Sequence, residues 1–287
     1  MTTQNMPRHH PDILVTGSSG TTGSCVCSSL DSMNTSYITT TSKRDKHNPT
    51  RRWLDFCNPE SYLGALKGIK KIFLLRPPAI SNVPKYITPF LEEAKRQGVE
   101  YILFISIVGV EDMSYVPHYK VEHAIEELEF EHTFLRCGFF MQNFSVQHRR
   151  EIKDTDTIYI PAGRAQFTFV DAQDIGQIAA ICLTQDSTPN KLTITGPELI
   201  DLNTAANIFT EQLGRMITYK SPNIISFIRY RISIGDSLPQ SFVMVMLYTL
   251  TRFSKQQSIS TDGETIIGKK TTTLSQFVAR NRDLWAQ

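Results

Sequence analysis

The first half of the chain alternates between two patterns of apolar and polar positions. Short apolar runs that are typical of strands occur at residues 13–16, 37–41, 71–75, 101–106 and 133–136. Two of these runs are apolar at consecutive positions, as expected for strands that helices cover on both faces of a sheet. Segments with helical spacing separate the later runs, at residues 83–97 and 119–129. This alternation predicts an α/β fold with a doubly wound parallel sheet and right-handed crossovers.

The pattern changes after residue 144. Short strand patterns are then mixed with helical patterns, at residues 157–160, 166–170, 172–184, 192–195, 203–213 and 274–286. The helical run within 174–183 is expected to return to the first half and pack on its sheet. The second half is therefore predicted to be a smaller α+β region that is interleaved with the first.

A glycine-rich turn joins the first predicted strand to a helical run at residues 24–30. We expect Gly17 to permit a sharp turn, Gly20 to let the backbone approach a pyrophosphate, and Gly23 to let the helix pack close to the sheet. The helix N-terminus then directs free N–H groups at the phosphates. The alternative is an ordinary structural turn, because Gly, Ser and Thr also form loops. The predicted cofactor contacts in this turn are Gly17, Ser19, Gly20, Thr21, Thr22 and Gly23.

Strand, turn and helix together predict a Rossmann domain that binds NAD(P). We place this domain at residues 12–150, after a disordered tail at 1–11. The interleaved region at 151–287 is expected to carry the substrate site or a partner site.

The residues that follow the second predicted strand indicate the preferred cofactor. Ser42, Lys43 and Arg44 lie about 20 residues beyond the last glycine of the turn, where an acidic residue binds the ribose of NAD and a basic residue accommodates the phosphate of NADP. Asp45 comes only after the two cations. NADP(H) is therefore favoured over NAD(H). The alternative is a solvated Lys-Arg pair at the start of a loop.

Composition limits the partners and the compartment. The 287 residues carry a net charge of +2 and form no basic stripe, so nothing indicates nucleic acid. The five cysteines are scattered without metal-ligand spacing, which favours a reduced, cytoplasmic protein with no metal site. His9 and His10 are assigned to the polar tail. The apolar run at 242–250 is too short to span a membrane and is interpreted as a buried or substrate-facing helix.

Several segments resemble a known family when they are taken in order along the chain. They are 13–23 (ILVTGSSGTTG), 53–56 (WLDF), 73–78 (FLLRPP), 98–106 (GVEYILFIS), 135–144 (LRCGFFMQNF), 169–175 (FVDAQDI) and 195–198 (TGPE). On this basis the chain is identified as a member of the NmrA-like family, an atypical group within the extended short-chain dehydrogenase/reductase superfamily.

The resemblance implies further positions around the cofactor. Asp55 and Phe56 resemble the pair that flanks the adenine, and the segment Leu75, Arg76 and Pro77 resembles the loop beside the ribose and pyrophosphate. These positions agree with the rule that ligands lie at the carboxyl ends of parallel strands. The alternative for Phe56 is a place in the hydrophobic core.

Two later segments resemble the catalytic end of the site. Ser106 takes the place of the family's active-site serine or its substitute, and Phe140 to Asn143 resemble the segment beside the nicotinamide. The alternatives are a core role for Phe140 and a turn role for Asn143.

The proton relay of most short-chain dehydrogenases is missing. That relay uses Tyr and Lys four residues apart on a helix, and none of the ten tyrosines has Lys four residues later. Tyr119 and Lys120 are adjacent at the place where that pair would stand. Lys120 is a candidate for the ribose hydroxyls, and Tyr115, His118 or Tyr119 for the proton donor. Ser106, Tyr119 and Lys120 are the predicted catalytic residues.

Two functions fit this sequence. The favoured one is an NADPH-dependent reductase of a small apolar carbonyl compound such as a quinone or an enone, because residues 139–144 and 242–246 would give an aromatic, apolar lining. The alternative is a non-catalytic redox sensor that binds NAD(P) and a partner protein. Residues 219–253 would form an enclosed pocket in the first case and an exposed apolar patch in the second. The oligomeric state, monomer or dimer, stays open.

Overall fold

The structure is a computed structural model that describes residues 11–44, 48, 50–253 and 258–287. The predicted tail, except Pro11, and Asp45 lie outside the described residues. Contacts between residues divide the chain into two compact units. The first unit comprises residues 1–137 and 172–194, and the second comprises residues 138–171 and 195–287.

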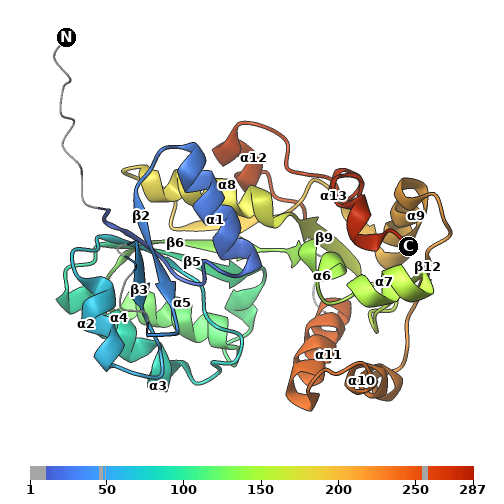
Figure 1. The fold of residues 1–287 in the computed structure, drawn as a ribbon, viewed down its shortest axis with the longest axis horizontal. Coiled ribbons are helices and arrows are strands. Elements are labelled where there is room, and N and C mark those ends of the chain that lie inside the picture. The colour runs from blue at the N-terminus through green and yellow to red at the C-terminus, as the bar shows by residue number, and fades with distance from the viewer. Residues whose placement is uncertain (1–10, 45–47, 49, 254–257) are drawn as a thin grey trace, which may run out of the picture. The chain divides into compact units, whose positions relative to one another are not determined.

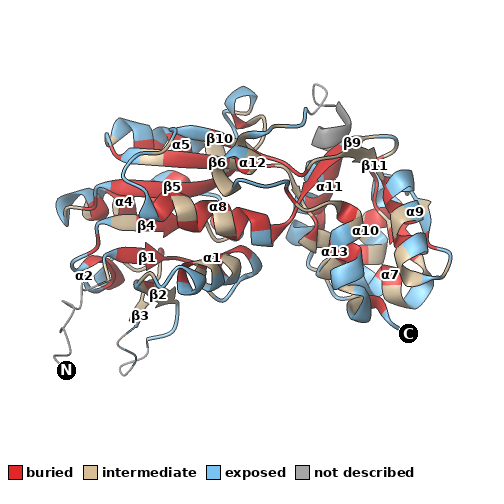
Figure 2. Cartoon of the chain, turned by 90° about the horizontal axis from the view of Figure 1, so that it is seen from above, coloured by how far each residue is buried: buried red, intermediate tan, exposed pale blue. Residues whose placement is uncertain are grey.

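The first unit is built on a parallel sheet of seven strands (Figure 1). Their order, β10-β6-β5-β4-β1-β2-β3, can be followed in Figure 2. The α/β fold with a doubly wound sheet is thereby confirmed. The strands are β1 Ile13–Val15, β2 Tyr37–Thr41, β3 Arg51–Trp53, β4 Lys71–Leu74, β5 Tyr101–Ile107, β6 Glu131–Cys137 and β10 Lys191–Ile194.

Strand β10 corrects one expectation. The pattern at 192–195 was assigned to the second region, but it forms the edge of the main sheet and pairs in parallel with β6, with Lys191 opposite Phe134. The other edge strand, β3, is not evident from the sequence because two of its three residues are arginines. Edge strands face water along one side, so they lack the continuous apolar pattern of central strands.

The described part of this unit contains six α-helices. They are α1 Thr21–Ser32, α2 Glu60–Leu66, α3 Val83–Tyr86, α4 Thr88–Arg96, α5 Pro117–Glu127 and α8 Ala172–Thr184. The single helix expected at 83–97 is two helices, because Pro89 is compatible only with the first turn of a helix and α4 restarts there. Asn82 caps α3 by accepting a hydrogen bond from the Lys85 N–H.

The two faces of the sheet bury different helices. Even-numbered apolar residues such as Ile72 and Phe104 belong to one core cluster with α2, α4 and α5. Odd-numbered residues such as Phe73 and Leu103 are buried on the opposite face, where α8 contacts β4 and β5, as predicted for the run within 174–183. The central strands are coloured as buried in Figure 2. A Cβ on Gly176 of α8 would lie 2.6 Å from the Cys25 carbonyl carbon, so α1 and α8 are in close contact at this glycine.

The second unit contains two small sheets and several helices. Strand β9 pairs antiparallel with β11 and parallel with β7, and β8 pairs in parallel with β12. These strands are β7 Phe139–Phe140, β8 Thr157–Tyr159, β9 Gln166–Val170, β11 Leu199–Asp201 and β12 Thr218–Lys220. The helices are α6 Gln142–Ser145, α7 Arg149–Thr155, α9 Leu202–Leu213, α10 Ile224–Ser233, α11 Leu238–Phe253, α12 Asp262–Ile267 and α13 Leu274–Arg280. The helix expected at 274–286 ends at Arg280 and continues as a 3₁₀ turn, Arg282–Trp285.

A buried polar cluster lies beneath α10 and α11. The Tyr248 hydroxyl is 2.5 Å from Nε2 of His148, and Arg231 donates a hydrogen bond of 2.8 Å to the Glu151 carboxylate. Arg231 also forms an ion pair with Asp236. Burial lowers the pKa of His148, and the charge of Arg231 adds to this effect while Glu151 opposes it. This cluster ties α10 and α11 to α7.

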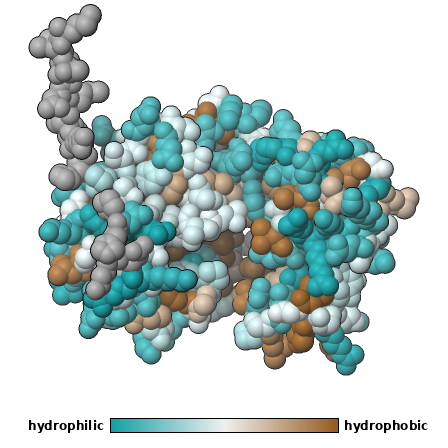
Figure 3. Space-filling model, in the orientation of Figure 1, coloured by the Kyte–Doolittle hydropathy of each residue, from teal (hydrophilic) through white to brown (hydrophobic). Residues whose placement is uncertain are grey.

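The outward sides of α10 and α11 expose apolar side chains, which we call the apolar face (Figure 3). Its members are Ile224, Ile225, Ile232, Leu238, Phe242, Val243, Met246 and Leu247. The helix expected at 242–250, buried or facing the substrate, is buried on one side, through Met244, Val245 and Tyr248. Among the described residues, no helix combines the length and apolar character that crossing a membrane requires.

The contact between α1 and α8 predicts opposite effects of two alanine substitutions. Gly176→Ala places a methyl group against the Cys25 backbone and should lower the free energy of unfolding by about 1–3 kcal/mol. Gly64→Ala is the control, because Gly64 lies in α2 with open space around it, and it should stabilise by about 0.5–1 kcal/mol. Urea unfolding measures both. Equal stability of the two variants would contradict the tight helix contact.

Candidate functional site

The loop after β1 is fixed to the carboxyl end of β4. Both the backbone N–H and the hydroxyl of Thr16 donate to the Phe73 carbonyl, each at 3.0 Å. The same hydroxyl accepts a hydrogen bond of 2.8 Å from the Leu75 N–H. The Leu75 side chain also packs against Gly17, where an added Cβ would lie 2.8 Å from it. The glycine turn and the loop 75–77 are therefore one connected structure.

The turn itself requires glycine at two positions. Gly17 has φ of 65°, in the left-handed region, and its carbonyl accepts a hydrogen bond of 2.9 Å from the Gly20 N–H. A Cβ on Gly23 would lie only 2.2 Å from the Gly17 carbonyl oxygen. Gly23 thus lets the helix approach the turn's own backbone, whereas the sequence suggested an approach to the sheet.

Helix α1 begins with its N–H groups available. Gly20 is the N-cap and has no side chain to accept from them, and no acidic residue lies in the first turn. Ser19 and Thr21 are exposed beside this terminus, and Thr22 is buried. A helix N-terminus of this kind fits a pyrophosphate, because its free donors and its dipole both favour an anion.

The basic residues after β2 lie at the exposed end of that strand. Ser42, Lys43 and Arg44 are all exposed, and the Lys43 N–H donates to the Thr41 hydroxyl at 3.2 Å. The Arg44 guanidinium lies over the Trp53 ring, 5.1 Å from its centroid. Trp53 was not among the predicted site residues. The signal for it is its place at the start of the segment 53–56, which resembles the family.

Asp55 and Phe56 follow β3 but have different surroundings. The Asp55 carboxylate accepts a hydrogen bond of 2.9 Å from the Cys57 N–H and is half-buried. The Phe56 ring is 7% exposed and packs edge-on against Phe90 in the core, which is the alternative left open for it. Asp55 is therefore the better-placed ligand of this pair.

Arg76 holds the loop that follows β4. One of its guanidinium nitrogens donates to the carbonyls of Pro77, Pro78 and Ile80, at 2.9, 3.3 and 2.6 Å. Its Nε has no hydrogen-bond partner among the described residues. Burial lowers the pKa of Arg76. Because Arg76 binds neutral carbonyls and no described carboxylate, it adds an unbalanced positive charge to this edge of the sheet.

Ser106 lies near the carboxyl end of β5 and is 1% exposed. Its hydroxyl makes no hydrogen bond to any described residue. Its register partner on β6 is Arg136, whose guanidinium donates to the carboxylates of Glu122 and Glu111 at 2.7 and 2.9 Å. This ion-pair network was not foreseen, since only the register of β5 and β6 brings its members to Ser106.

The other predicted catalytic residues lie on the first turn of α5. The Tyr119 ring is half-buried beside His123, with 6.2 Å between ring centroids, and Lys120 is exposed. Phe140 and Asn143 belong to the second unit, where Phe140 is in β7 opposite Val170 and the Asn143 carbonyl accepts from the His148 N–H at 2.9 Å.

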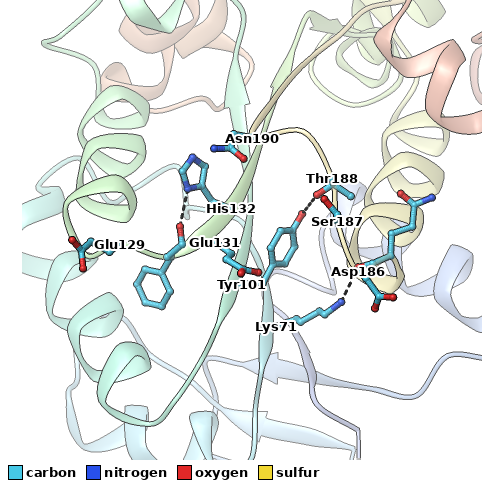
Figure 4. A pocket seen from close by; sticks show the side chains of 11 residues that line it. Lys71, Tyr101, Glu129, Glu131, His132, Asp186, Ser187, Thr188 and Asn190 are labelled. Atoms are coloured by element: carbon cyan, nitrogen blue, oxygen red, sulfur yellow. Dashed lines mark hydrogen bonds between the residues drawn. The ribbon is translucent and has the colours of Figure 1, made fainter.

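A cavity of about 490 Å³ lies at the opposite edge of the sheet, near the amino ends of β4, β5 and β6 (Figure 4). Lys71 donates there to the carbonyls of Leu183 and Gln185 at 2.9 and 3.1 Å, and the Tyr101 and Thr188 hydroxyls are 3.1 Å apart. Lys71, Tyr101 and Thr188 therefore already have partners within the chain. The cavity is also remote from the loops after the strands, where a parallel sheet binds ligands.

Two curated relatives cover almost the whole chain. An uncharacterized oxidoreductase of Bacillus subtilis, YesF, is 29% identical over 98% of both chains. Agroclavine dehydrogenase of Claviceps fusiformis is 26% identical over 95% of this chain and 98% of its own.

Solved structures share the fold. The triphenylmethane reductase of Citrobacter sp., complexed with NADP(H), has a TM-score of 0.82 and 21% identity, covering 94% of this chain and 99% of its own. The NADPH-dependent quinone oxidoreductase QOR2 of Escherichia coli, complexed with NADPH, has a TM-score of 0.79 and 20% identity, with coverage of 94% and 99%. Agroclavine dehydrogenase, the triphenylmethane reductase and the quinone oxidoreductase are all named as oxidoreductases.

The predicted family is confirmed by the comparison with family models. The model described as the NmrA-like family matches residues 10–278. That match includes the glycine turn, the loops after β2 and β4, and all the predicted catalytic residues. The chain belongs to the NmrA-like family.

Proposed function

We propose that this protein is an NADPH-dependent reductase of a small apolar carbonyl compound, such as a quinone or an enone. The observation that carries the proposal is the glycine turn, whose backbone leaves no room for a Cβ at Gly23 and whose helix begins with uncapped N–H groups. These features fit a pyrophosphate. When bound, the nicotinamide nucleotide supplies the hydride for the reduction.

Most of the predicted contacts have a place in this proposal. Thr21, Thr22 and the backbone at Gly20 would hold the pyrophosphate. Ser42, Lys43 and Arg44 would hold the ribose phosphate of NADPH, with Arg44 steadied by the Trp53 ring. Asp55 and the loop of Leu75, Arg76 and Pro77 would flank the adenosine and the ribose. Lys120 would reach the ribose hydroxyls, and Phe140 and Asn143 would lie beside the nicotinamide, as the family resemblance implies for the last two.

The relatives support the reaction class. A quinone oxidoreductase that uses NADPH shares the fold, and a dehydrogenase is similar over nearly the full length. Reduction of a quinone also needs little from a proton donor, since the reduced product can take protons from water. That agrees with the missing Tyr-x-x-x-Lys pair.

One observation favours the alternative, a redox sensor with a partner protein. The apolar face of α10 and α11 is exposed, which is the arrangement expected for a partner surface.

The decisive test is NADPH oxidation by the purified protein, followed at the nicotinamide absorbance. Menadione, benzoquinone and cyclohexenone serve as acceptors. We expect oxidation well above the rate without protein for at least one of them. Tight NADPH binding without turnover on the whole panel would contradict the reductase and support the sensor.

Charge reversal after β2 tests the cofactor preference. Lys43→Glu combined with Arg44→Glu should weaken NADPH binding by about tenfold to a hundredfold, since two charge-assisted contacts are lost. NADH affinity should change little. Quenching of tryptophan fluorescence measures both affinities, and Lys67→Glu, at another exposed lysine, is the control. An equal loss for both cofactors, or no loss, would show that the preference is wrong.

A further inference from the structure

Helix α5 presents one stripe of side chains to the sheet. Val121, Glu122 and Ile125 are its buried members, and His118 lies one turn earlier on the same stripe. The His118 ring lies 6.1 Å from the ring of Phe104 on β5, with 34° between the planes. The His118 side chain therefore points toward β5, although His118 lies in the first turn of the helix.

Phe104 also defines which side of the sheet Ser106 faces. Residues two apart on a strand point to the same face, so Ser106 shares the face of Phe104 and lies one step nearer the carboxyl end. The Ser106 hydroxyl is buried without a partner among the described residues, and leaving it unpaired is costly, so it is available for a ligand or for water. The His118 ring lies against Phe104 on the same face of the sheet.

Fixed charges surround this pair. Arg136 and Glu122 face it from β6 and α5, and Glu111 also binds Arg136, so these charges largely cancel. Arg76 after β4 has no carboxylate partner among the described residues. Burial lowers the pKa of His118 to about 3, and the Arg76 charge adds to the shift. At neutral pH the imidazole is uncharged, with one N–H donor and one acceptor.

We propose that His118 and Ser106 together hydrogen-bond the carbonyl oxygen of the substrate, an inference that rests on the proposed reductase function. The carbonyl carbon gains a C–H bond, the π electron pair moves onto oxygen, and water supplies the proton, with oxidation of NADPH to NADP⁺. Two donors aimed at that oxygen stabilise its developing negative charge. A neutral imidazole is suited to this because it donates a hydrogen bond without a counter-charge.

Tyr119 and Lys120 are less suited to that role. Successive helix residues point about 100° apart, so neither shares the sheet-facing stripe of His118. Tyr119 lies against His123, and Lys120 is exposed without a side-chain partner among the described residues. His118, the residue before Tyr119, thus takes the place of the missing tyrosine as the polar group that faces the sheet.

Substitutions with a matched control test this assignment. For any acceptor that the wild type reduces, His118→Leu should lower kcat/KM by about a hundredfold and Ser106→Ala by a similar factor. His118→Gln keeps a donor and should retain more activity than His118→Leu. NADPH affinity should stay within about twofold, because neither residue holds the phosphates. His123→Gln, at the exposed histidine of the same helix, should behave as the wild type. Wild-type activity in His118→Leu, or a loss confined to Tyr119→Phe, would overturn the assignment.

A binding measurement separates this inference from the proposed reaction. If the wild type reduces no acceptor, the proposed function fails. Calorimetry of naphthol binding to NADP⁺-saturated protein then tests His118 and Ser106 alone. We expect binding by the wild type and by His123→Gln, with at least about a tenfold loss in His118→Leu. Equal affinity in all three proteins, or no binding by the wild type, would overturn the inference.

The position of His118 also predicts a pH effect on stability. Its folded-state pKa of about 3 lies below the ordinary value, so only the unfolded chain binds this proton as the pH falls below about 6.5. Relative to His118→Gln, the wild type should lose up to about tenfold per pH unit in its folding equilibrium constant between pH 6.5 and 5. Urea unfolding across this range measures it, with His123→Gln as control. Parallel curves for wild type and His118→Gln would show that His118 is not held neutral.

Discussion

The Gly17 carbonyl lies so close to the first turn of α1 that no side chain fits between them. A Cβ on Gly23 would lie 2.2 Å from that oxygen, and the same carbonyl accepts the Gly20 N–H. This contact sets where α1 begins and leaves its N–H groups without a side-chain cap. Thr16 joins this turn to β4, because its hydroxyl donates to the Phe73 carbonyl and accepts from the Leu75 N–H. The anion site therefore follows from backbone packing.

The alternation of side chains along the strands determines the rest of the site. One face of the sheet is closed by α1 and α8, in close contact at Gly176, and contributes packing. The other face carries α5, and there the register of β5 and β6 sets Ser106 beside Arg136. His118 approaches this face through Phe104. The buried hydroxyl of Ser106, without a partner among the described residues, thus lies near the carboxyl end of β5.

Much of this arrangement could be predicted from the sequence, because it depends on local pattern. The five strands predicted in the first half are all present, within one or two residues of their expected ends for most of them, and the turn at 17–23 joins β1 to α1. Strand β10 was misplaced because its partner β6 lies more than fifty residues earlier, and pairing at that range leaves no local signal. The direction of His118 and the lack of a partner at Ser106 depend on tertiary packing. Phe56 shows how a motif position can also belong to the core, since its ring packs against Phe90.

The central claim is that the turn at 17–23 binds NADPH through its pyrophosphate. A crystal structure of the full chain with NADP⁺ tests it most directly. We predict pyrophosphate oxygens within hydrogen-bond distance of the N–H groups at the start of α1, and the ribose phosphate beside Lys43 and Arg44. A nucleotide bound elsewhere, or a turn that stays free of phosphate at saturating NADP⁺, would contradict the account.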